Sequence, residues 1–369
     1  MIQCIMNHTK TTERVVNFNA GPSTLPLEVL EKAQAEFINY QGKGLSVLEM
    51  SHRSGDFMAI RDQAESAIRQ LLSISDAYTV LFLQGGATTQ FSSVPMYFGQ
   101  TGPVSFIHTG SWTKKALAEI KKFGQHTLLA SSEDTNFDRI PSIDTSAIDP
   151  NSSYVYCCSN NTIYGTQFQE FPDTGAVPLV ADMSSDILSR PLNIDQFGLI
   201  FAGAQKNAGP AGVTVVIARK DWIAANANPN LPLMFQYDKH MKEDSMLNTC
   251  PTFSIYLLGL TAQWLLDQGG VAAIEARNQA KAHALYNYID ANDFYTACVT
   301  GSSRSLMNVC FKTPSESLDT EFHKRAAEAG FIGLKGHRLV GGLRASIYNA
   351  MPSAGVDQLI GFMDEFRKR

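Results

Sequence analysis

The segment Phe201-Ala-Gly-Ala-Gln-Lys-Asn-Ala-Gly-Pro-Ala-Gly212 joins two short apolar runs, Leu199–Gly203 and Val213–Ala218. Apolar runs of this length that are bounded by glycine and proline predict buried strands. Lys206 therefore follows a buried strand directly. Burial of its charge is costly, and it lowers the pKa of a lysine so that the amine can attack a carbonyl group. An ordinary lysine on a surface loop fits this segment equally well.

Similar runs extend the pattern toward the N-terminus. Four more strands are expected, at Thr79–Leu83, Val104–His108, Tyr154–Ser159 and Val177–Ala181. Apolar residues recur at helical spacing between some of these runs, from Phe57 to Leu71 and from Trp112 to Phe123, where Gly124 ends the second helix. This alternation predicts an α/β fold with a largely parallel sheet and helices on both faces.

The pattern changes near Gly269–Gly270. A long helical stretch, two strands and two further helices follow, at Val271–Ile289, Leu306–Phe311, Thr320–Ala329, Leu343–Tyr348 and up to Phe366. A chain of 369 residues is long enough for two domains. We therefore expect a large domain over residues 25–268 and a smaller α+β domain formed by residues 1–24 and 269–369.

The composition is that of an ordinary globular protein, with a net charge of −5 and no apolar run near the ~18–20 residues that a membrane span needs. We expect neither nucleic-acid nor membrane binding. Residues 1–14 lack the pattern of a signal peptide. The six cysteines show neither a CxxC pair nor metal-ligand spacing: Cys4, Cys157, Cys158, Cys250, Cys298 and Cys310. This pattern predicts reduced thiols, a cytoplasmic location and no metal site.

Asp182 gives Lys206 a chemical partner. It ends the run Val177-Pro-Leu-Val-Ala-Asp182, at the strand edge where open α/β sheets bind ligands. Pyridoxal phosphate needs such a pair, because a carboxylate keeps its pyridine nitrogen protonated while a lysine amine condenses with its aldehyde. The alternative for Asp182 alone is a helix N-cap, which the following Met183-Ser-Ser also fits.

Three other positions follow predicted strands. The segment Leu83-Gln-Gly-Gly-Ala-Thr-Thr-Gln90 can bind a phosphate at a helix N-terminus, although it is neither GxGxxG nor a Walker loop and is a weak signal alone. Trp112 follows Gly110-Ser and can stack on a flat cofactor, although a lone tryptophan more often covers a core. Thr162 can hydrogen-bond a ring hydroxyl. Thr249 carries no signal of its own.

With these residues in place, the chain resembles the phosphoserine aminotransferase family from about Asn17 to the C-terminus. The matching segments, in order, are Asn17-Phe-Asn-Ala-Gly-Pro22, Ser51-His-Arg53, Ala202-Gly-Ala-Gln-Lys-Asn207, Asn248-Thr249, Lys335-Gly-His-Arg338 and Gly342-Leu-Arg-Ala-Ser-Ile-Tyr-Asn-Ala-Met-Pro352. The resemblance implies the aspartate-aminotransferase-like fold of pyridoxal-phosphate-dependent transferases. That fold has a mainly parallel seven-stranded sheet in a large domain and a smaller α+β domain. It also implies a homodimer whose active sites lie at the subunit interface.

The resemblance also assigns roles. It makes Lys206 the catalytic, cofactor-bound lysine, Asp182 the partner of the ring nitrogen, Trp112 the stacking residue and Thr162 the contact of the ring oxygen. It assigns the cofactor phosphate to Ala87, Thr88 and Gln205, with Asn248 and Thr249 from the other subunit. Two departures are that many relatives have serine at Ala20 and some have arginine at Thr88.

Two His-Arg pairs indicate the substrate. By resemblance, His52, Arg53, His337 and Arg338 surround the distal acidic group, with the second pair from the partner subunit, and Arg344 binds the α-carboxylate. Arginine suits both a carboxylate and a phosphate. The implied reaction is reversible amino transfer between glutamate and 3-phosphohydroxypyruvate, which yields O-phosphoserine and 2-oxoglutarate in serine biosynthesis. The 4-phosphohydroxythreonine pair of pyridoxine biosynthesis is a further candidate substrate.

Other functions remain open at this point. A serine or alanine transaminase acting on glyoxylate or pyruvate shares the fold but does not need two His-Arg pairs. A cysteine desulfurase needs an exposed reactive thiol, whereas Cys310 lies in an apolar run. A non-catalytic pyridoxal-phosphate-binding protein does not need Arg344. A nicotinamide dehydrogenase would carry a glycine fingerprint, and this sequence has none.

Overall fold

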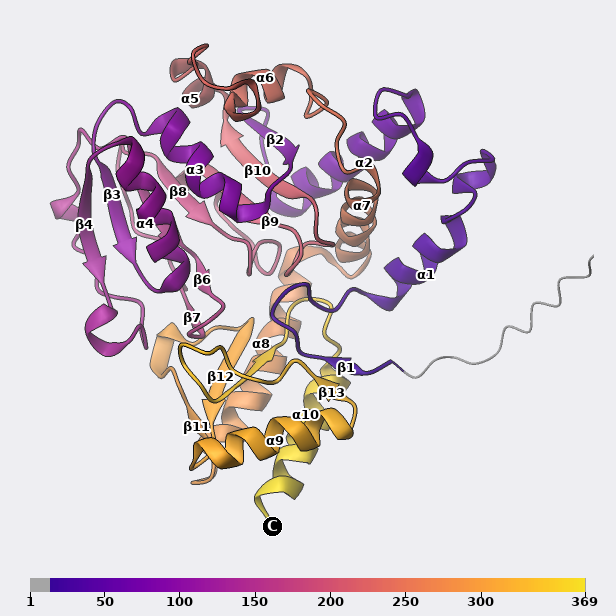
Figure 1. Ribbon diagram of the computed structural model, residues 1–369, viewed down its shortest axis with the longest axis vertical. Helices are drawn as coiled ribbons and strands as arrows, with labels where there is room; N and C mark the ends of the chain where they lie inside the picture. Colours follow the sequence, from indigo (N-terminus) through magenta and orange to yellow (C-terminus); the bar gives the residue numbers. More distant parts are fainter. Residues whose placement is uncertain (1–13, 369) are drawn as a thin grey trace, which may run out of the picture.

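The structure is a computed structural model that describes residues 14–368. The expectations about the leading residues, including Cys4 and the first part of the smaller domain, lie outside the described residues. Two bodies of secondary structure are visible in Figure 1, a large sheet with helices on both faces and a smaller group around α8 (Gly270–Asp290).

The large sheet has seven strands and contains all six strands predicted for this part of the chain. In spatial order they are β2 (Tyr78–Leu83), β10 (Thr214–Arg219), β9 (Phe197–Gly203), β8 (Leu179–Asp182), β5 (Tyr154–Cys158), β3 (Val104–His108) and β4 (His126–Ser131). Only β10 runs antiparallel to its two neighbours, so the prediction of a mainly parallel seven-stranded sheet is confirmed. The unpredicted strand β4 lies at an edge and includes the exposed Leu128, so it shows no apolar run.

Alternate residues of the strands pack into two separate cores, one on each face of the sheet. Val215 and Ile217 of β10 pack into one core, and Val216 and Ala218 pack into the other. This alternation of side chains is the period-two geometry of a strand that is buried on both faces. One core includes α2 (Gly55–Leu72) and α7 (Thr252–Asp267), and the other includes α3 (Gly86–Phe98) and α4 (Ser111–Phe123). The expected helices on both faces are therefore present.

The remaining helices of this part are short or peripheral: α1 (Leu27–Glu36), α5 (Lys220–Ala225) and α6 (Tyr237–Lys242). Two short strands, β6 (Asn160–Asn161) and β7 (Thr166–Gln167), form a hairpin after β5. None of the helices over residues 14–368 combines the length and the apolar character needed to cross a bilayer.

The smaller body has its own apolar core. Its antiparallel sheet consists of β11 (Thr296–Ala297), β12 (Asn308–Lys312) and β14 (Leu343–Ser346), and it packs with α8, α9 (Glu316–Glu328) and α10 (Ser353–Arg367). The N-terminal strand β1 (Val16–Asn17) pairs in parallel with β13 (Phe331–Ile332) and brings Phe18 into this core. The α+β character expected after Gly269 is thus present, whereas the domain boundaries stay a prediction.

Candidate active site

Lys206 follows β9 and points into a polar junction between the two bodies. Its Nζ donates a 2.6 Å hydrogen bond to Oγ1 of the buried Thr162 and lies 5.0 Å from the centroid of the Trp112 ring. Burial lowers the pKa of Lys206, and the nearby charge of Asp182 opposes this effect. A lowered pKa increases the fraction of neutral amine, which is the nucleophilic form.

Asp182 ends β8, the strand beside β9, as the sequence predicted. It is 4% exposed, and its Oδ1 accepts hydrogen bonds from the N–H (3.0 Å) and the hydroxyl (2.6 Å) of Ser184. Ser184 is fixed in turn, because its hydroxyl accepts the N–H of Gly203 on β9 at 3.1 Å. Burial raises the pKa of Asp182, and the Ser184 bonds and the Lys206 charge lower it. Within residues 14–368 no group bonds to Oδ2, so this oxygen can accept an N–H from a ligand.

The helix N-cap interpretation of Asp182 is wrong, because no helix of the described chain begins directly after it; the carboxylate instead caps a turn through the N–H of Ser184. This turn uses Oδ1 alone and leaves Oδ2 free for a ligand. Ser184 was not predicted as a site residue. The signal that marks it is its position two residues after the aspartate, the usual spacing of an Asx turn.

Trp112 lies in the first turn of α4. Gly110 has a φ of +146°, and a Cβ there would lie 2.5 Å from Nδ2 of Asn161, so only glycine fits. Within the described residues, the buried Nε1 of Trp112 has no hydrogen-bond partner. An indole whose ring faces Lys206 and whose N–H is unpaired is suited to cover a flat polar ligand.

The turn before α3 presents free backbone donors. Gly85 has a φ of +89°, and a Cβ there would lie 1.9 Å from Oγ1 of Thr89. The first N–H that bonds back is that of Thr89, which donates to the carbonyl of Gly85, so the N–H groups of residues 86–88 point outward from the helix start. Free N–H groups at a helix start are suited to bind an anion, and those of Ala87 and Thr88 are among them.

Two segments border the same turn. The carbonyl of Thr249 accepts a 3.1 Å bond from the Gln84 amide, and Asn248 lines a cavity of about 330 Å³ together with Gly85. The segment therefore lies beside the turn of its own chain. Gln205 folds its side chain toward Gly203, and within residues 14–368 its amide makes no hydrogen bond. The amide is available to a ligand.

The N-terminal segment covers Lys206 from another side. Ser23 donates its N–H to the Gln205 carbonyl at 3.0 Å, and a Cβ at Gly21 would lie 3.0 Å from Cγ of Lys206. The Ala20 carbonyl accepts a 2.7 Å bond from the hydroxyl of Tyr348. At Ala20, where many relatives have serine, the contact is therefore made by the backbone carbonyl. Tyr348 was not predicted.

Arg344 on β14 brings a positive charge from the smaller body to the same junction. Its Nη1 donates a 3.0 Å bond to the Thr162 carbonyl, and its buried Nε has no partner within the described chain. Desolvation lowers the pKa of His337, and the charges of Arg344, Arg338 and Lys115 lower it further. His337 and Arg338 thus lie near Arg344 of their own chain, and the expectation that this pair reaches the pocket of the partner subunit stays a prediction.

Lys115 belongs to the same group and was not predicted. Its Nζ lies 4.5 Å from the centroid of the Trp112 ring. Val340, in the loop that carries His337 and Arg338, packs in one cluster with Trp112. The signal in the sequence is the spacing of three residues from Trp112, which places both side chains on one face of α4.

The other predicted pair lies elsewhere. His52 is buried with an unpartnered Nε2, and Arg53 is exposed in the turn before α2. No hydrogen bond, ion pair or ring contact within residues 14–368 joins either of them to Lys206, Thr162 or Arg344. In Figure 1 the segment between α1 and α2 lies on the right, away from α4 on the left.

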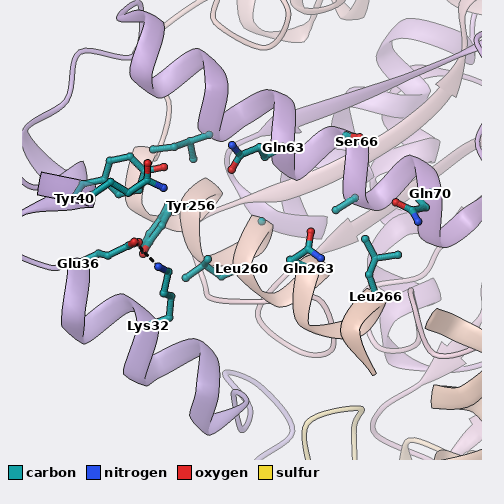
Figure 2. A pocket seen from close by; sticks show the side chains of 14 residues that line it. Lys32, Glu36, Tyr40, Gln63, Ser66, Gln70, Tyr256, Leu260, Gln263 and Leu266 are labelled. Carbon is teal, nitrogen blue, oxygen red and sulfur yellow. Dashed lines mark hydrogen bonds and ion pairs between the residues drawn. The ribbon is translucent and has the colours of Figure 1, made fainter. Parts of the chain in front are cut away.

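A second pocket lies apart from all the predicted site residues. Figure 2 shows this pocket of about 310 Å³ between α1, α2 and α7. Its charged groups already satisfy one another, since Lys32 pairs with Glu36 at 2.6 Å and Tyr256 donates its hydroxyl to the same carboxylate. The junction around Lys206 is therefore the better candidate for chemistry.

The cysteines do not supply a second candidate nucleophile. The five described cysteines are free and four of them are buried. Burial raises the pKa of Cys310 to about 12, so its thiol stays protonated and unreactive. This agrees with the placement of Cys310 in a core and disfavours a desulfurase. Among residues 14–368 no group of three or more potential ligands could hold a metal ion.

Comparison with known proteins identifies the family. The family model described as aminotransferase class-V matches residues 15–359. The chain belongs to this family. Class-V membership covers almost the whole described chain, and it makes the protein an enzyme that transfers amino groups.

Within the class-V aminotransferases, the phosphoserine aminotransferase of Geobacillus kaustophilus (strain HTA426) is 52% identical over 359 residues, covering 97% of this chain and 99% of the relative. The solved phosphoserine aminotransferase of Bacillus circulans subsp. alkalophilus has a TM-score of 0.94 at 48% identity, covering 97% of this chain and 99% of that one. The pyridoxal-phosphate-bound phosphoserine aminotransferase of Trichomonas vaginalis has a TM-score of 0.90 at 38% identity, covering 95% and 100%. The fold predicted from the sequence is therefore confirmed.

Proposed function

We propose that this class-V aminotransferase uses pyridoxal phosphate to move an amino group reversibly between glutamate and 3-phosphohydroxypyruvate. The observation that carries the proposal is the convergence of Lys206, Thr162 and Arg344, with Asp182 on the neighbouring strand. A nucleophilic amine, a buried carboxylate and a cation suited to an α-carboxylate are the groups that this chemistry needs. Their arrangement fits the cofactor that the Trichomonas relative binds.

The unpaired polar groups described above define how the cofactor is held. Asp182 would accept a hydrogen bond from the ring nitrogen through the free Oδ2, and Trp112 would cover one face of the ring. Thr162 would donate its hydroxyl to the ring oxygen. The N–H groups of Ala87 and Thr88, with the Gln205 amide, would bind the phosphate at the N-terminus of α3. Asn248 and Thr249 would border this phosphate site.

When bound, pyridoxal phosphate supplies a protonated ring that stabilises negative charge at the substrate Cα. Lys206 accepts the Cα proton of the amino donor through Nζ, and in the second half of the reaction it gives a proton to Cα of the amino-acid product. Asp182 stays ionised beside the protonated ring nitrogen and thereby keeps that proton in place. Arg344 binds the α-carboxylate and orients the Cα–H bond toward Lys206.

The cationic group selects an acidic substrate. His337 lies within reach of the charges of Arg338, Arg344 and Lys115, and Lys115 lies over the Trp112 ring. Together these groups suit a phosphate or a second carboxylate. Glyoxylate and pyruvate would leave these charges without a partner, which disfavours the small-amino-acid alternative. A non-catalytic cofactor carrier has no use for Arg344. The 4-phosphohydroxythreonine pair is a second candidate substrate, because it carries the same phosphate.

His52 and Arg53 support a homodimer with shared active sites. Arg53 is exposed, and within residues 14–368 it makes no hydrogen bond or ion pair with the Lys206 junction, so we assign it to the pocket of a second copy. In this proposal the first His-Arg pair, rather than the second, crosses to the partner. A cytoplasmic location is part of the proposal and is supported by the five free cysteines.

A coupled assay tests the function. Glutamate is offered with 3-phosphohydroxypyruvate, pyruvate or glyoxylate, and 2-oxoglutarate is measured. We expect kcat/KM to favour the phosphorylated acceptor by roughly 10²-fold or more, because the smaller acceptors leave the cationic side chains of the pocket without a partner. A preference for pyruvate or glyoxylate would assign the enzyme to the small-amino-acid group.

A further inference from the structure

One face of α8 carries two buried polar side chains that the proposed chemistry does not use. Asn278 and Lys281 are 1% and 3% exposed and lie three residues apart, on one side of the helix. The Lys281 ammonium donates hydrogen bonds to the carbonyls of Ile347 (3.0 Å), Tyr348 (2.7 Å) and Met351 (3.0 Å). Its three donors therefore meet three acceptors in one loop.

No carboxylate compensates this charge. None of the ion pairs within residues 14–368 includes Lys281, and burial together with the charge of Arg277 lowers its pKa to about 7. A buried ammonium without a counter-ion costs stability. Buried groups that cost stability occur preferentially at functional sites. The loop that Lys281 holds is therefore a candidate for a functional role.

The Ile347–Met351 loop contacts the surroundings of Lys206 on two sides. The N–H of Asn349 donates to Oδ1 of Asn207, the residue after Lys206, at 2.9 Å. The hydroxyl of Tyr348 holds the carbonyl of Ala20, in the segment that covers Lys206. The loop also follows β14, which carries Arg344.

Asn278 supports the same loop from α8. Its Nδ2 donates to Oδ1 of Asn349 at 2.8 Å and to the carbonyl of Ser189 at 3.3 Å. The Asn349 amide in turn donates to the carbonyl of Leu188 at 2.9 Å. A continuous chain of hydrogen bonds thus leads from Asn278 through Asn349 to Asn207, next to Lys206.

The Ile347–Met351 loop also separates two cavities. A cavity of about 590 Å³ lies behind it and is lined by Lys281, Asn349 and Met351 among others. On the other side, Asn349 and Ala350 line a small pocket together with Lys206 and Asn207. If the loop moved into the large cavity, the stem of Lys206 would lose its support and water would reach it.

We propose that Asn278 and Lys281 are positioning residues for Lys206, which they hold in place through the Ile347–Met351 loop and Asn207. The proposal rests on the proposed function, because it concerns the amine that performs the proton transfer. It couples a helix of the smaller body to the reactive group of the larger one. Neither residue touches the substrate or the cofactor.

Lys281→Met and Asn278→Ala test the proposal in the full-length holoenzyme. Lys281→Met keeps the length of the side chain but removes the three donors. Lys324→Met, on the exposed face of α9, and Asn287→Ala, on the exposed face of α8, are the matched controls. We expect kcat to fall roughly 10- to 100-fold in the two test variants, because small displacements of a reacting group have effects of this size. The KM for glutamate should change less, and the controls should match the wild type.

Two readouts separate positioning from general stability. The pH titration of the absorbance of bound pyridoxal phosphate should shift in both test variants, since it reports the surroundings of Lys206. Amide hydrogen exchange in the apo-protein should accelerate in residues 347–351 and also in residues 204–209. Faster exchange confined to the loop, with an unchanged titration, would overturn the proposal.

A double-mutant cycle with Asn207→Ala tests the route. If the effect passes through Asn207, Asn278→Ala should reduce kcat far less in the Asn207→Ala background than in the wild type. Additive losses would contradict this route. If Lys281→Met does not fold, Asn278→Ala decides the question alone. A wild-type enzyme without transaminase activity would instead refute the proposed function, which keeps the two failures distinct.

Discussion

At the scale of the residue, the hydrogen bond between Lys206 and Thr162 joins the nucleophile to the group expected to bind the cofactor ring. The bond keeps the amine oriented before the cofactor arrives, because the 2.6 Å contact fixes the end of a flexible side chain. The backbone carbonyl of Thr162 also accepts a hydrogen bond from Arg344, so this one residue orients both Lys206 and Arg344.

Lys206→Ala should bind pyridoxal phosphate only reversibly, so dialysis should leave a colourless protein. In the wild type, borohydride should fix the cofactor covalently, and peptide mapping should locate it on Lys206. The variant should lose essentially all transaminase activity, since it has no group for the Cα proton. An unchanged visible spectrum in Lys206→Ala would refute the assignment.

His337 should make the binding of phosphorylated ligands depend on pH. Burial and the neighbouring cations lower its pKa in the free enzyme, and a phosphate bound among them would raise it. Between the two pKa values binding takes up a proton, so affinity should increase as the pH falls through this range. Calorimetric titration with phosphoserine in buffers of different ionisation enthalpy measures the uptake. We expect His337→Asn to abolish it, and equal uptake in the variant would exclude His337 as the source.

Sequence reasoning was most successful for residues whose chemistry is unusual at their position. The charge of Lys206 after a buried strand and the carboxylate of Asp182 at a strand end are visible without coordinates. Ser184 and Lys115 were not found, because a serine and an exposed lysine are common and acquire meaning only from their neighbours. Lys281 was missed for the same reason, since its three carbonyl partners lie some 70 residues further along the chain.

At the scale of the element, α4 presents Trp112 and Lys115 on one face toward the candidate site. This arrangement places a positive charge beside Trp112, in a chain where Thr88 replaces the arginine of some relatives. The charge comes from a different helix, so it contributes independently to the electrostatic field around the Trp112 ring.

Lys115→Met should raise the KM for 3-phosphohydroxypyruvate about fivefold, which corresponds to ~1 kcal/mol of lost attraction at a partly solvated site. The affinity for pyridoxal phosphate should stay within about twofold. Lys114→Met is the control, because it removes the same charge from the adjacent exposed position. High salt should reduce the difference between Lys115→Met and the wild type. Identical KM values for the two variants would show that Lys115 has no special role.

The strands and helices predicted from periodicity were largely correct because the large sheet is buried on both faces and its strands form uninterrupted apolar runs. Strand β4 escaped prediction, since it is an edge strand with exposed side chains. The start of β12 was predicted two residues too early and the end of β14 two residues too late, because apolar residues lie beyond the paired segments.

At the scale of the whole molecule, the two His-Arg pairs are separated within one chain, and they were expected to share a pocket only across two subunits. His337 and Arg338 lie near Arg344, and Arg53 is exposed on another part of the surface. A sequence gives no distance between two loops, so neither the separation nor the domain boundaries followed from the pattern of residues.

Mixing two inactive variants tests the shared active site. Lys206→Ala and Arg53→Ala should each be inactive or nearly so with the phosphorylated substrate. After co-refolding, mixed dimers should contain one intact site out of two and regain up to about one quarter of the wild-type activity, for random pairing of equal amounts. No recovery, despite mixed dimers in native mass spectrometry, would show that Arg53 acts within its own chain.

The pairing of β1 with β13 has a consequence for how the protein is made. Val16 pairs with Phe331, so 331 − 16 = 315 residues separate the partners. At ~5–20 residues per second, a ribosome needs roughly 16 to 63 s to supply the second strand after the first. During this time the large sheet can form and Ser23 can bond to it, but Val16 and Asn17 have no strand to pair with. The anchor of the segment that covers Lys206 is therefore among the last parts of the newborn chain to be completed.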